Sequence, residues 1–311
     1  MTARSRAGRS AATIYLAAGA ALLLLGACGR AGGDARPAAR SEALVIGAVP
    51  DQEPQELQRL YAVVADYLSE ELDVPVAYLP VTDYTAAVSL FKVGDLDLVW
   101  FGGLTGVQAR LQVDGADAIA QRDIDARFRS VFIVHSSTGL APAEDVAGLS
   151  GLRGLRFTFG SESSTSGRLM PQHYLDRAGV RLDDFEGDPG FSGDHDKTID
   201  LVEAGTFQAG VVNEQVWDAR VDAGEVDLDK VKVFFRTPAY PDYHWVVRPD
   251  VDDRFGDGFA AKIEAALTGL DPSDRRQARI LELFGAGRFI PTDNGNYRTI
   301  ERVARDAGLL Q

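Results

Sequence analysis

A loop rich in hydroxyl groups is the part of the sequence best suited to holding a small anion. The stretch FGSESSTSGRLMP, residues 159–171, follows an alternating, strand-like run and precedes a segment with helical character. Its hydroxyls and free backbone N–H groups would lie at a helix N-terminus, where unpaired donors and the positive end of the helix dipole coincide. Serine and threonine are also common helix caps, so the loop by itself leaves a purely structural role open.

The elements around this loop are predicted to alternate between strands and helices. Such βαβ alternation predicts an α/β protein with mainly parallel sheets. Expected strands are 44–49, 74–79 and 96–101 with helices at 54–72 and 83–93, followed by strands at 155–159 and 207–212 and helices from 164 and at 194–204.

Two segments of the chain repeat one another and predict two equivalent lobes. The residues DYTAAVSLFKVGDLDLVWFGG from Asp83 align with DHDKTIDLVEAGTFQAGVVNE from Asp194 at a constant offset of 111 residues. The alignment pairs Tyr84 with His195 near the start of a helix in each lobe. Helix–glycine–strand units look alike in many proteins, so chance similarity is the alternative.

The two-lobed architecture brings polar residues from both lobes to one cleft. Ligands of open α/β sheets bind outside the carboxyl ends of the strands, and in two-lobed proteins this edge faces the cleft between the lobes. One wall is expected to carry Ser163, Ser164, Thr165, Ser166 and His195, and the other Tyr84, Phe101 and Gly102.

A later proline-rich segment and two acids supply further candidates. The aromatic residues at 240, 243 and 245 either pack in the core or contact the ligand, and Tyr243 is retained as a candidate. Glu214 and Asp242 are either solvated charges or hydrogen-bond acceptors, and Glu214 is retained as a candidate.

The N-terminal segment predicts secretion and lipid anchoring. Three arginines precede the apolar run 11–25, which is too short for a comfortable membrane span. The sequence LGACG at 25–29 resembles a bacterial lipobox, which implies a signal peptide at 1–27 and lipidation of Cys28, followed by a tether at 28–42. Cys28 is the only cysteine, so neither a disulfide framework nor a cysteine metal site is expected.

Charge and motifs exclude several classes of function. The formal net charge of −14 argues against nucleic acid or an anionic membrane surface as a partner. The sequence contains no H-E-x-x-H, Walker or G-x-S-x-G motif, so we expect neither an enzyme nor a cofactor or metal. A serine hydrolase using Ser164, His195 and Asp196 is a remote alternative, because nothing orders these residues into a triad.

Several long motifs together resemble one family of transport proteins. The chain is similar to the extracytoplasmic solute-binding proteins of phosphonate, phosphite and related oxyanion ABC transporters, and nearest to the branch assigned to selenate transport. The resemblance covers nearly all of the mature chain. The motifs are AVPDQEP at 48, PVTDY at 80, VWFGGLTGVQAR at 99, FGSESSTSGRLMP at 159, SGDHD at 192, NEQVWD at 213, PAYPDYHWVVR at 238 and RFIPTDNGNY at 288.

This resemblance implies a fold and a function. The fold would be a type II-like periplasmic-binding fold with two crossing segments, with lobe 1 at 43–132 and 240–311 and lobe 2 at 133–239. The protein would be a monomeric lipoprotein on the outer side of the cell membrane that passes a small tetrahedral oxyanion to an ABC permease. An oxyanion sensor that docks on a histidine kinase is the alternative.

The resemblance also implies ligand contacts. They come from the Ser/Thr run, from His195 and from Tyr84. Arg168 stands where many relatives have histidine, so a ligand contact from that position does not follow from the resemblance.

The acids near the proposed donors bear on which oxyanion binds. Sulfate and selenate are fully ionised at about pH 7 and only accept hydrogen bonds, whereas a monoprotonated phosphorus oxyanion also donates one. A buried carboxylate would repel a dianion. Glu214, Asp194 and Asp196 therefore favour a protonated phosphorus oxyanion over selenate. If these acids cap helices instead, His195 and Arg168 would satisfy the anion.

Overall fold

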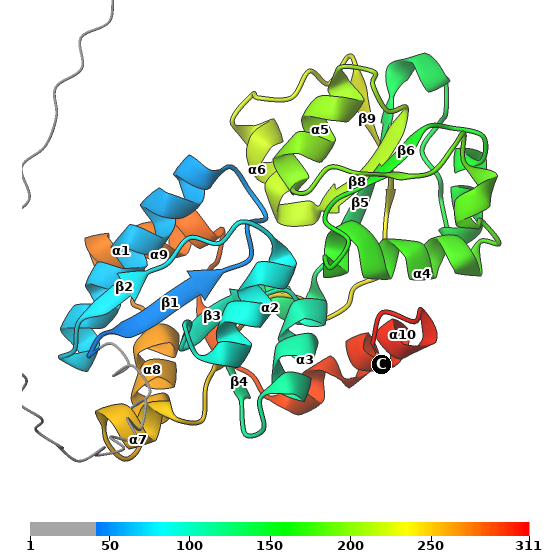
Figure 1. Cartoon of the computed structure of the whole chain (residues 1–311). Coiled ribbons are helices and arrows are strands. Elements are labelled where there is room, and N and C mark those ends of the chain that lie inside the picture. The colour runs from blue at the N-terminus through cyan, green and yellow to red at the C-terminus, as the bar shows by residue number, and fades with distance from the viewer. Residues whose placement is uncertain (1–41, 311) are drawn as a thin grey trace, which may run out of the picture. The chain divides into compact units, whose positions relative to one another are not determined.

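The computed structural model describes residues 42–310, which form two β-sheets flanked by helices (Figure 1). The first sheet contains β1 (Leu44–Ala48), β2 (Val76–Tyr78), β3 (Leu98–Phe101), β4 (Asp117–Arg122), β10 (His244–Val247) and β11 (Phe289–Pro291). Their order is β11-β4-β10-β3-β1-β2. β1 is parallel to β2 and β3, whereas β10 is antiparallel to β3 and β4, and β11 is antiparallel to β4.

The second sheet contains β5 (Ser130–His135), β6 (Phe157–Phe159), β7 (Gly190–Phe191), β8 (Ala209–Asn213) and β9 (Val231–Arg236), in the order β7-β6-β8-β5-β9. β6 is parallel to β7 and β8, and β5 is antiparallel to β8 and β9. The prediction of mainly parallel sheets is therefore wrong, because the strands that bring the chain from one sheet to the other, β5 and β10, run against their neighbours.

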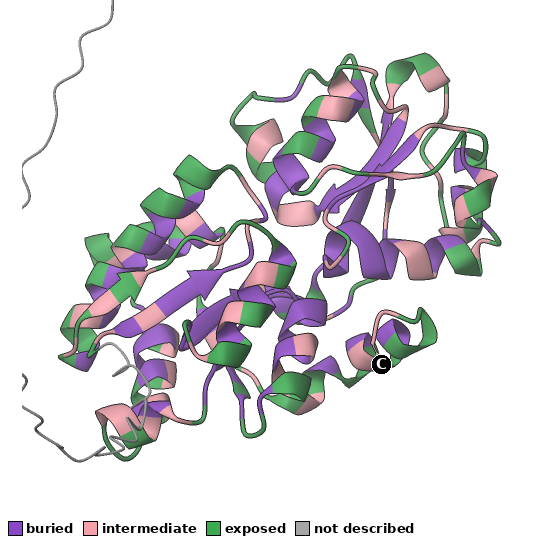
Figure 2. Cartoon of the chain, viewed as in Figure 1, coloured by how far each residue is buried: buried purple, intermediate pink, exposed green. Residues whose placement is uncertain are grey.

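The helices lie on the faces of the two sheets, and their outward surfaces are the most exposed part of the chain (Figure 2). The part of the chain built on the first sheet is called lobe 1 below, and the part built on the second sheet lobe 2. The helices of lobe 1 are α1 (Pro54–Leu72), α2 (Tyr84–Val93), α3 (Gly103–Gln112), α7 (Val251–Phe255), α8 (Phe259–Thr268), α9 (Arg275–Phe284) and α10 (Arg298–Asp306), and those of lobe 2 are α4 (Met170–Arg177), α5 (His195–Glu203) and α6 (Glu214–Asp222).

The chain crosses between the sheets in two segments that pair with each other. The first crossing follows β4 and the second precedes β10. Phe128 of the first and Tyr240 of the second exchange backbone hydrogen bonds of 2.8 and 2.9 Å. The lobe boundary expected between residues 132 and 133 falls inside β5, so the first crossing lies a few residues earlier in the chain. The boundary expected between residues 239 and 240 lies within the second crossing.

The two helices predicted to be repeats begin in the same way. Asp83 caps α2 and Asp194 caps α5, each accepting a backbone N–H three residues further on, at 2.8 and 2.7 Å. Such caps satisfy donors that the helix itself leaves unpaired. Tyr84 and His195 are consequently the first residues of their helices, at equivalent positions in the two lobes.

Candidate functional site

The Ser/Thr loop after β6 folds into a π-helical turn at Thr165–Leu169. π-Turns are rare and often occur at functional sites. Ser164 is the N-cap of this turn, and its hydroxyl accepts the Gly167 N–H at 2.9 Å. Thr165 and Ser166 are equally buried. Capping thus accounts for Ser164 and leaves the hydroxyls of its two neighbours for other partners.

The N-terminus of α3 in lobe 1 meets this turn of lobe 2. The Leu104 N–H donates to Thr165 Oγ1 at 2.9 Å, and the Gly103 N–H donates to Asp242 Oδ1 at 2.9 Å. A Cβ atom at Gly102 would lie 3.2 Å from Thr165 Oγ1 and 3.4 Å from Asp242 Oδ1. The absence of a side chain at Gly102 therefore leaves room for both polar groups beside the helix.

His195 is a neutral hydrogen-bond donor in this region. It is buried, and burial lowers its pKa to about 3. Its Nδ1 accepts the Asn213 N–H at 3.3 Å, so the proton of the neutral ring is on Nε2. Nε2 lies 3.4 Å from the Tyr243 hydroxyl, to which the Asn213 side chain also donates at 3.2 Å. His195 consequently offers an N–H group rather than a positive charge.

Three buried polar atoms in the same region have no hydrogen-bond partner within residues 42–310. They are Tyr84 Oη, Ser166 Oγ and Asp242 Oδ2. The negative charge of Asp242 raises the pKa of Tyr84, and the Ser166 hydroxyl lowers the pKa of Asp242. These groups are therefore neighbours. Because buried polar groups are normally paired, this arrangement is typical of a binding site for a ligand that both donates and accepts. The residues called the polar cluster below are Tyr84, Ser164, Thr165, Ser166, His195, Asn213, Asp242 and Tyr243.

Asp242 is the acid of the polar cluster. Its side chain is fully buried, and burial raises its pKa to about 7 although the Gly103 N–H and the Thr165 and Ser166 hydroxyls act in the opposite direction. Asp242 was a possible acceptor from the sequence but was not among the predicted ligand residues. The available signal was its place in the proline-rich motif PAYPDYHWVVR.

The three acids that lie near the donors in the sequence have other partners. Asp194 caps α5. Glu214 accepts a hydrogen bond of 2.7 Å from Arg236. Asp196 accepts the Glu53 N–H across the lobes at 3.0 Å. Of the two alternatives left open for these acids, capping holds for Asp194, and the acid beside the Ser/Thr hydroxyls is Asp242.

A second contact between the lobes joins the loop after β1 to the start of α5. The His195 N–H donates to the Asp51 carbonyl oxygen at 3.1 Å, close to the bond between Glu53 and Asp196. Burial raises the pKa of both Asp51 and Asp196 to about 6. Asp51, whose carboxyl group also lies near Tyr243, was not among the residues predicted from the sequence. The contact between the lobes thus buries several carboxyl groups.

Two predicted ligand residues, Phe101 and Ser163, lie outside the polar cluster, and so does Arg168, whose role was left open. The Phe101 ring packs edge-to-face on Phe91 in the core of lobe 1, with 5.6 Å between centroids. Ser163 is half-buried and lines an open cavity against α2 and α3. The Arg168 guanidinium lies 4.5 Å from the centre of the Phe159 ring. Phe101 and Arg168 are therefore held by contacts with aromatic rings.

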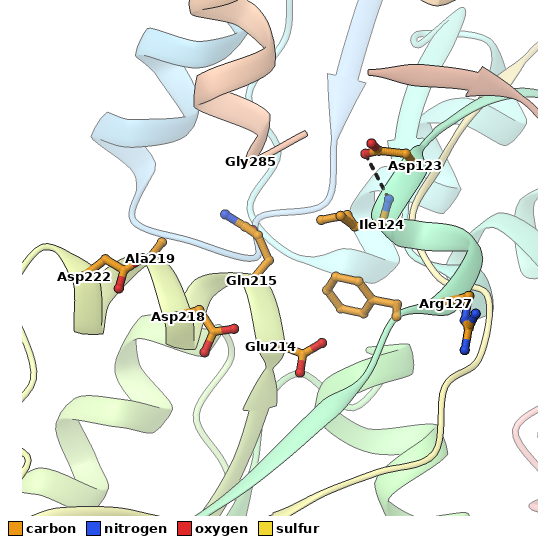
Figure 3. Close-up of a pocket in the computed structure, with 10 residues that line it drawn as sticks. Asp123, Ile124, Arg127, Glu214, Gln215, Asp218, Ala219, Asp222 and Gly285 are labelled. Atoms are coloured by element: carbon orange, nitrogen blue, oxygen red, sulfur yellow. Dashed lines mark hydrogen bonds between the residues drawn. The ribbon is translucent and has the colours of Figure 1, made fainter. Parts of the chain in front are cut away.

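A separate cavity of about 440 Å³ lies beside the first crossing segment (Figure 3). Ile124 and Phe128 give it an apolar wall. Helix α6 contributes Glu214 and Asp218. Arg236 holds both of these acids, at 2.7 Å each. No member of the polar cluster lines this cavity, so Glu214 belongs to a different region from Asp242.

The match to a known family extends over most of the chain. Residues 46–297 match the family described as "ABC transporter, phosphonate, periplasmic substrate-binding protein". The chain belongs to this family. Its relatives are substrate-binding proteins of ABC transporters and not enzymes, which confirms both the family expected from the motifs and the expectation that the chain is not an enzyme.

Individual relatives support the same assignment. The chain is 46% identical over 263 residues to the "Probable ABC transporter phosphite binding protein PhnD1" of Prochlorococcus marinus (strain MIT 9301), covering 84% of this chain and 89% of the relative. A solved structure of PhnD1 with methylphosphonate is 45% identical, with a TM-score of 0.84 over 86% of this chain and 99% of that one.

A more distant solved structure supports the fold alone. A binding protein component of an ABC phosphonate transporter from Pseudomonas aeruginosa is 17% identical, with a TM-score of 0.72 over 84% of this chain and 85% of that one. The two-lobed periplasmic-binding fold predicted from the sequence is confirmed by these neighbours.

Some predictions concern parts of the chain or partners that these comparisons do not reach. Among residues 42–310, no helix is both long enough and apolar enough to cross a membrane. The same residues include no set of three or more His, Cys, Asp or Glu side chains arranged to hold a metal ion. The signal segment and Cys28 lie outside the described residues, so lipid anchoring stays a prediction.

Proposed function

We propose that this protein captures a small, singly protonated phosphorus oxyanion, namely phosphite or a short alkylphosphonate, and delivers it to an ABC permease. The observation that carries the proposal is Asp242 Oδ2, a buried acceptor without a partner among the described residues, beside the hydroxyls of Ser166 and Tyr84. A ligand that accepts several hydrogen bonds and donates one matches this set.

The donors for the oxyanion would come from both lobes. Tyr84 belongs to lobe 1, and Thr165, Ser166 and His195 belong to lobe 2. All of these groups are neutral. That suits a chain of net charge −14, because local dipoles and helix N-termini, rather than the overall field, must attract the anion.

Asp242 would accept the proton that the ligand carries. Sulfate and selenate have no such proton and would place their negative charge against a buried carboxylate, which is unfavourable at low dielectric. Because the pKa of Asp242 is raised to about 7, the carboxyl group and a phosphorus oxyanion would share a proton near neutral pH. This argument favours a phosphorus oxyanion over selenate.

Binding would stabilise the contact between the lobes. A charge-assisted hydrogen bond contributes about 1.5–3 kcal/mol, so about four of them support micromolar affinity after the costs of association. Contacts to both lobes are complete only when the lobes meet, so the ligand shifts the population toward that arrangement. The permease would then receive the closed form.

The relatives support this ligand class. PhnD1 carries a phosphite-binding name, and its solved structure contains methylphosphonate. Delivery would take place outside the cytoplasm, with a monomeric protein tethered to the cell membrane through a lipid on Cys28.

The decisive experiment is a competition between anions on the purified protein. Thermal shift and calorimetry would compare phosphite, methylphosphonate, phosphate, sulfate and selenate at several pH values. We expect phosphite or methylphosphonate to bind most tightly and to displace the others. Tight selenate or sulfate binding that no phosphorus oxyanion displaces would refute the proposal and favour the selenate branch.

A further inference from the structure

A buried histidine behind the polar cluster ties Asp242 to α3. His244 is fully buried, its Nε2 lies 2.5 Å from Arg110 Nη1, and its Nδ1 lies 3.0 Å from the main-chain oxygen of Asp242. A guanidinium group only donates hydrogen bonds. Nε2 therefore accepts, and Nδ1 carries the proton and donates to Asp242.

Close packing holds this ring in one orientation. The Tyr297 ring stacks on it with 3.8 Å between centroids, and the Arg110 guanidinium lies 5.1 Å from the centre of Tyr297. A Cβ atom at Gly106 would lie 2.3 Å from His244 Nε2, so α3 approaches the ring only because residue 106 is glycine. Packing and hydrogen bonds of this kind are what keep a functional side chain in place.

Arg110 is partly buried, and its hydrogen-bond partner is unusual for an arginine. Within residues 42–310 it forms no ion pair with a carboxylate, and its acceptor is the neutral imidazole of His244. The charges of Glu301 and Asp117 raise the pKa of Arg110 from a longer distance, but burial has the larger effect and lowers this pKa to about 10. Burial and the charge of Arg110 in turn lower the pKa of His244. Desolvating a guanidinium group beside a neutral ring lowers the stability of the fold. Such unfavourable arrangements are typical of functional regions rather than of stabilising ion pairs.

We propose that His244 and Arg110 are positioning residues for Asp242. Three hydrogen bonds fix Asp242. The Gly103 N–H donates to its Oδ1 at 2.9 Å, the His244 ring donates to its main-chain oxygen, and its own N–H donates to the Asp125 carbonyl oxygen at 3.1 Å. Together they hold Oδ2 beside Ser166. The inference rests on the proposed function and adds the residues that make the site select a protonated anion over a fully ionised one.

The test measures selectivity, namely the ratio of the affinities for methylphosphonate and for sulfate, by calorimetry and competition at pH 6 and pH 8. His244→Phe keeps an aromatic ring and removes both hydrogen bonds, and we expect the ratio to fall about tenfold. His244→Asn retains a donor toward the main-chain oxygen of Asp242, and we expect it to restore the ratio to within about threefold of the wild-type value.

A matched control and a second variant make the result decisive. His173→Phe makes the same change on α4, outside the polar cluster, and should leave the ratio unchanged. If His244→Phe fails to fold, as judged by circular dichroism, Arg110→Gln decides the question, because it removes the guanidinium group that donates to the ring and leaves the ring itself in place, and it should also lower the ratio.

The outcomes separate this inference from the proposed function. An unchanged ratio in the folded His244→Phe protein, or in Arg110→Gln if the former does not fold, overturns the inference while the proposed function stands. A wild-type protein that binds neither methylphosphonate nor phosphite overturns the proposed function, and the inference with it.

Discussion

The backbone N–H of Leu104 donates to the hydroxyl of Thr165 at 2.9 Å, and this bond joins the first turn of α3 in lobe 1 to the Ser/Thr loop in lobe 2. Both residues are fully or almost fully buried. The hydroxyl of Thr165 therefore contributes to the contact between the lobes as well as to the polar cluster, and we expect ligand binding and closure to be coupled at this residue.

Thr165→Val should weaken both closure and ligand binding. The substitution keeps the shape of the side chain but leaves the buried Leu104 N–H without an acceptor, which costs about 1–3 kcal/mol. Calorimetry with methylphosphonate and small-angle scattering with and without ligand would measure the two effects. Thr165→Ser retains the hydroxyl and serves as the control. Equal affinities for the Val and Ser variants would contradict the coupling.

Ser166→Ala should separate binding from stability. The Ser166 hydroxyl is buried without a partner in the described part of the chain, so its loss should leave the melting temperature of the unliganded protein the same or slightly higher. Affinity should fall by about 1.5–3 kcal/mol, and the double variant Thr165→Ala with Ser166→Ala should lose about 3–5 kcal/mol. Ser163→Ala, which changes a side chain outside the polar cluster, is the control. A lower melting temperature with unchanged affinity would assign Ser166 a structural role.

Tyr84→Phe, in lobe 1, should likewise weaken ligand binding without lowering the stability of the unliganded protein. Tyr84 is 2% exposed and its hydroxyl has no partner among residues 42–310. Removing it should stabilise the unliganded protein by about 1 kcal/mol and weaken phosphite binding at least tenfold. Chemical denaturation and calorimetry would report the two quantities. Tyr78→Phe, in β2 outside the polar cluster, is a suitable comparison, and similar effects at both positions would argue against a ligand role for Tyr84.

The titration of Asp242 should appear as a pH dependence of stability. Burial raises its pKa from 3.8 to about 7, so the folded protein binds this proton more tightly than the unfolded chain. The stabilising effect of the bound proton is complete below about pH 4 and is lost as the pH rises through about 7.

Asp242→Asn removes this titration while Asp51 and Asp196 still titrate in both proteins. We therefore expect the melting temperature of the variant to rise relative to wild type between pH 5 and pH 8, measured without ligand. A difference that is constant with pH would mean that Asp242 is not the titrating group. With ligand, the variant should lose the preference for phosphite over sulfate.

Cys28→Ser should release the protein from the membrane fraction. A lipid chain contributes about 0.8 kcal/mol for each buried methylene group, and the sequence predicts no other anchor. Fractionation and immunoblotting would locate the protein. Continued membrane association would show that the N-terminal segment is retained as a membrane span.

The sequence was sufficient for features that depend on neighbouring residues. Helix caps act over three or four positions, so the helix starts after Asp83 and Asp194 could be predicted from local pattern alone. A capping role within the Ser/Thr loop was left open for the same reason, and the structure assigns it to Ser164. Ordered motifs along the chain also determined the family, because they retain a match over residues 46–297.

Only the tertiary structure decided which side chains meet. Asp242 reaches α3 from a segment 139 positions away, and Thr165 meets Leu104 across 61 positions. Strand β3 is buried along its whole length, so no alternation of polar and apolar residues could show that Phe101 points into the core. The crossing segments place Asp242 beside the Ser/Thr loop, whereas Glu214 lies beside Arg236. Which side chains meet depends on contacts between distant parts of the chain, and local sequence patterns do not encode these contacts.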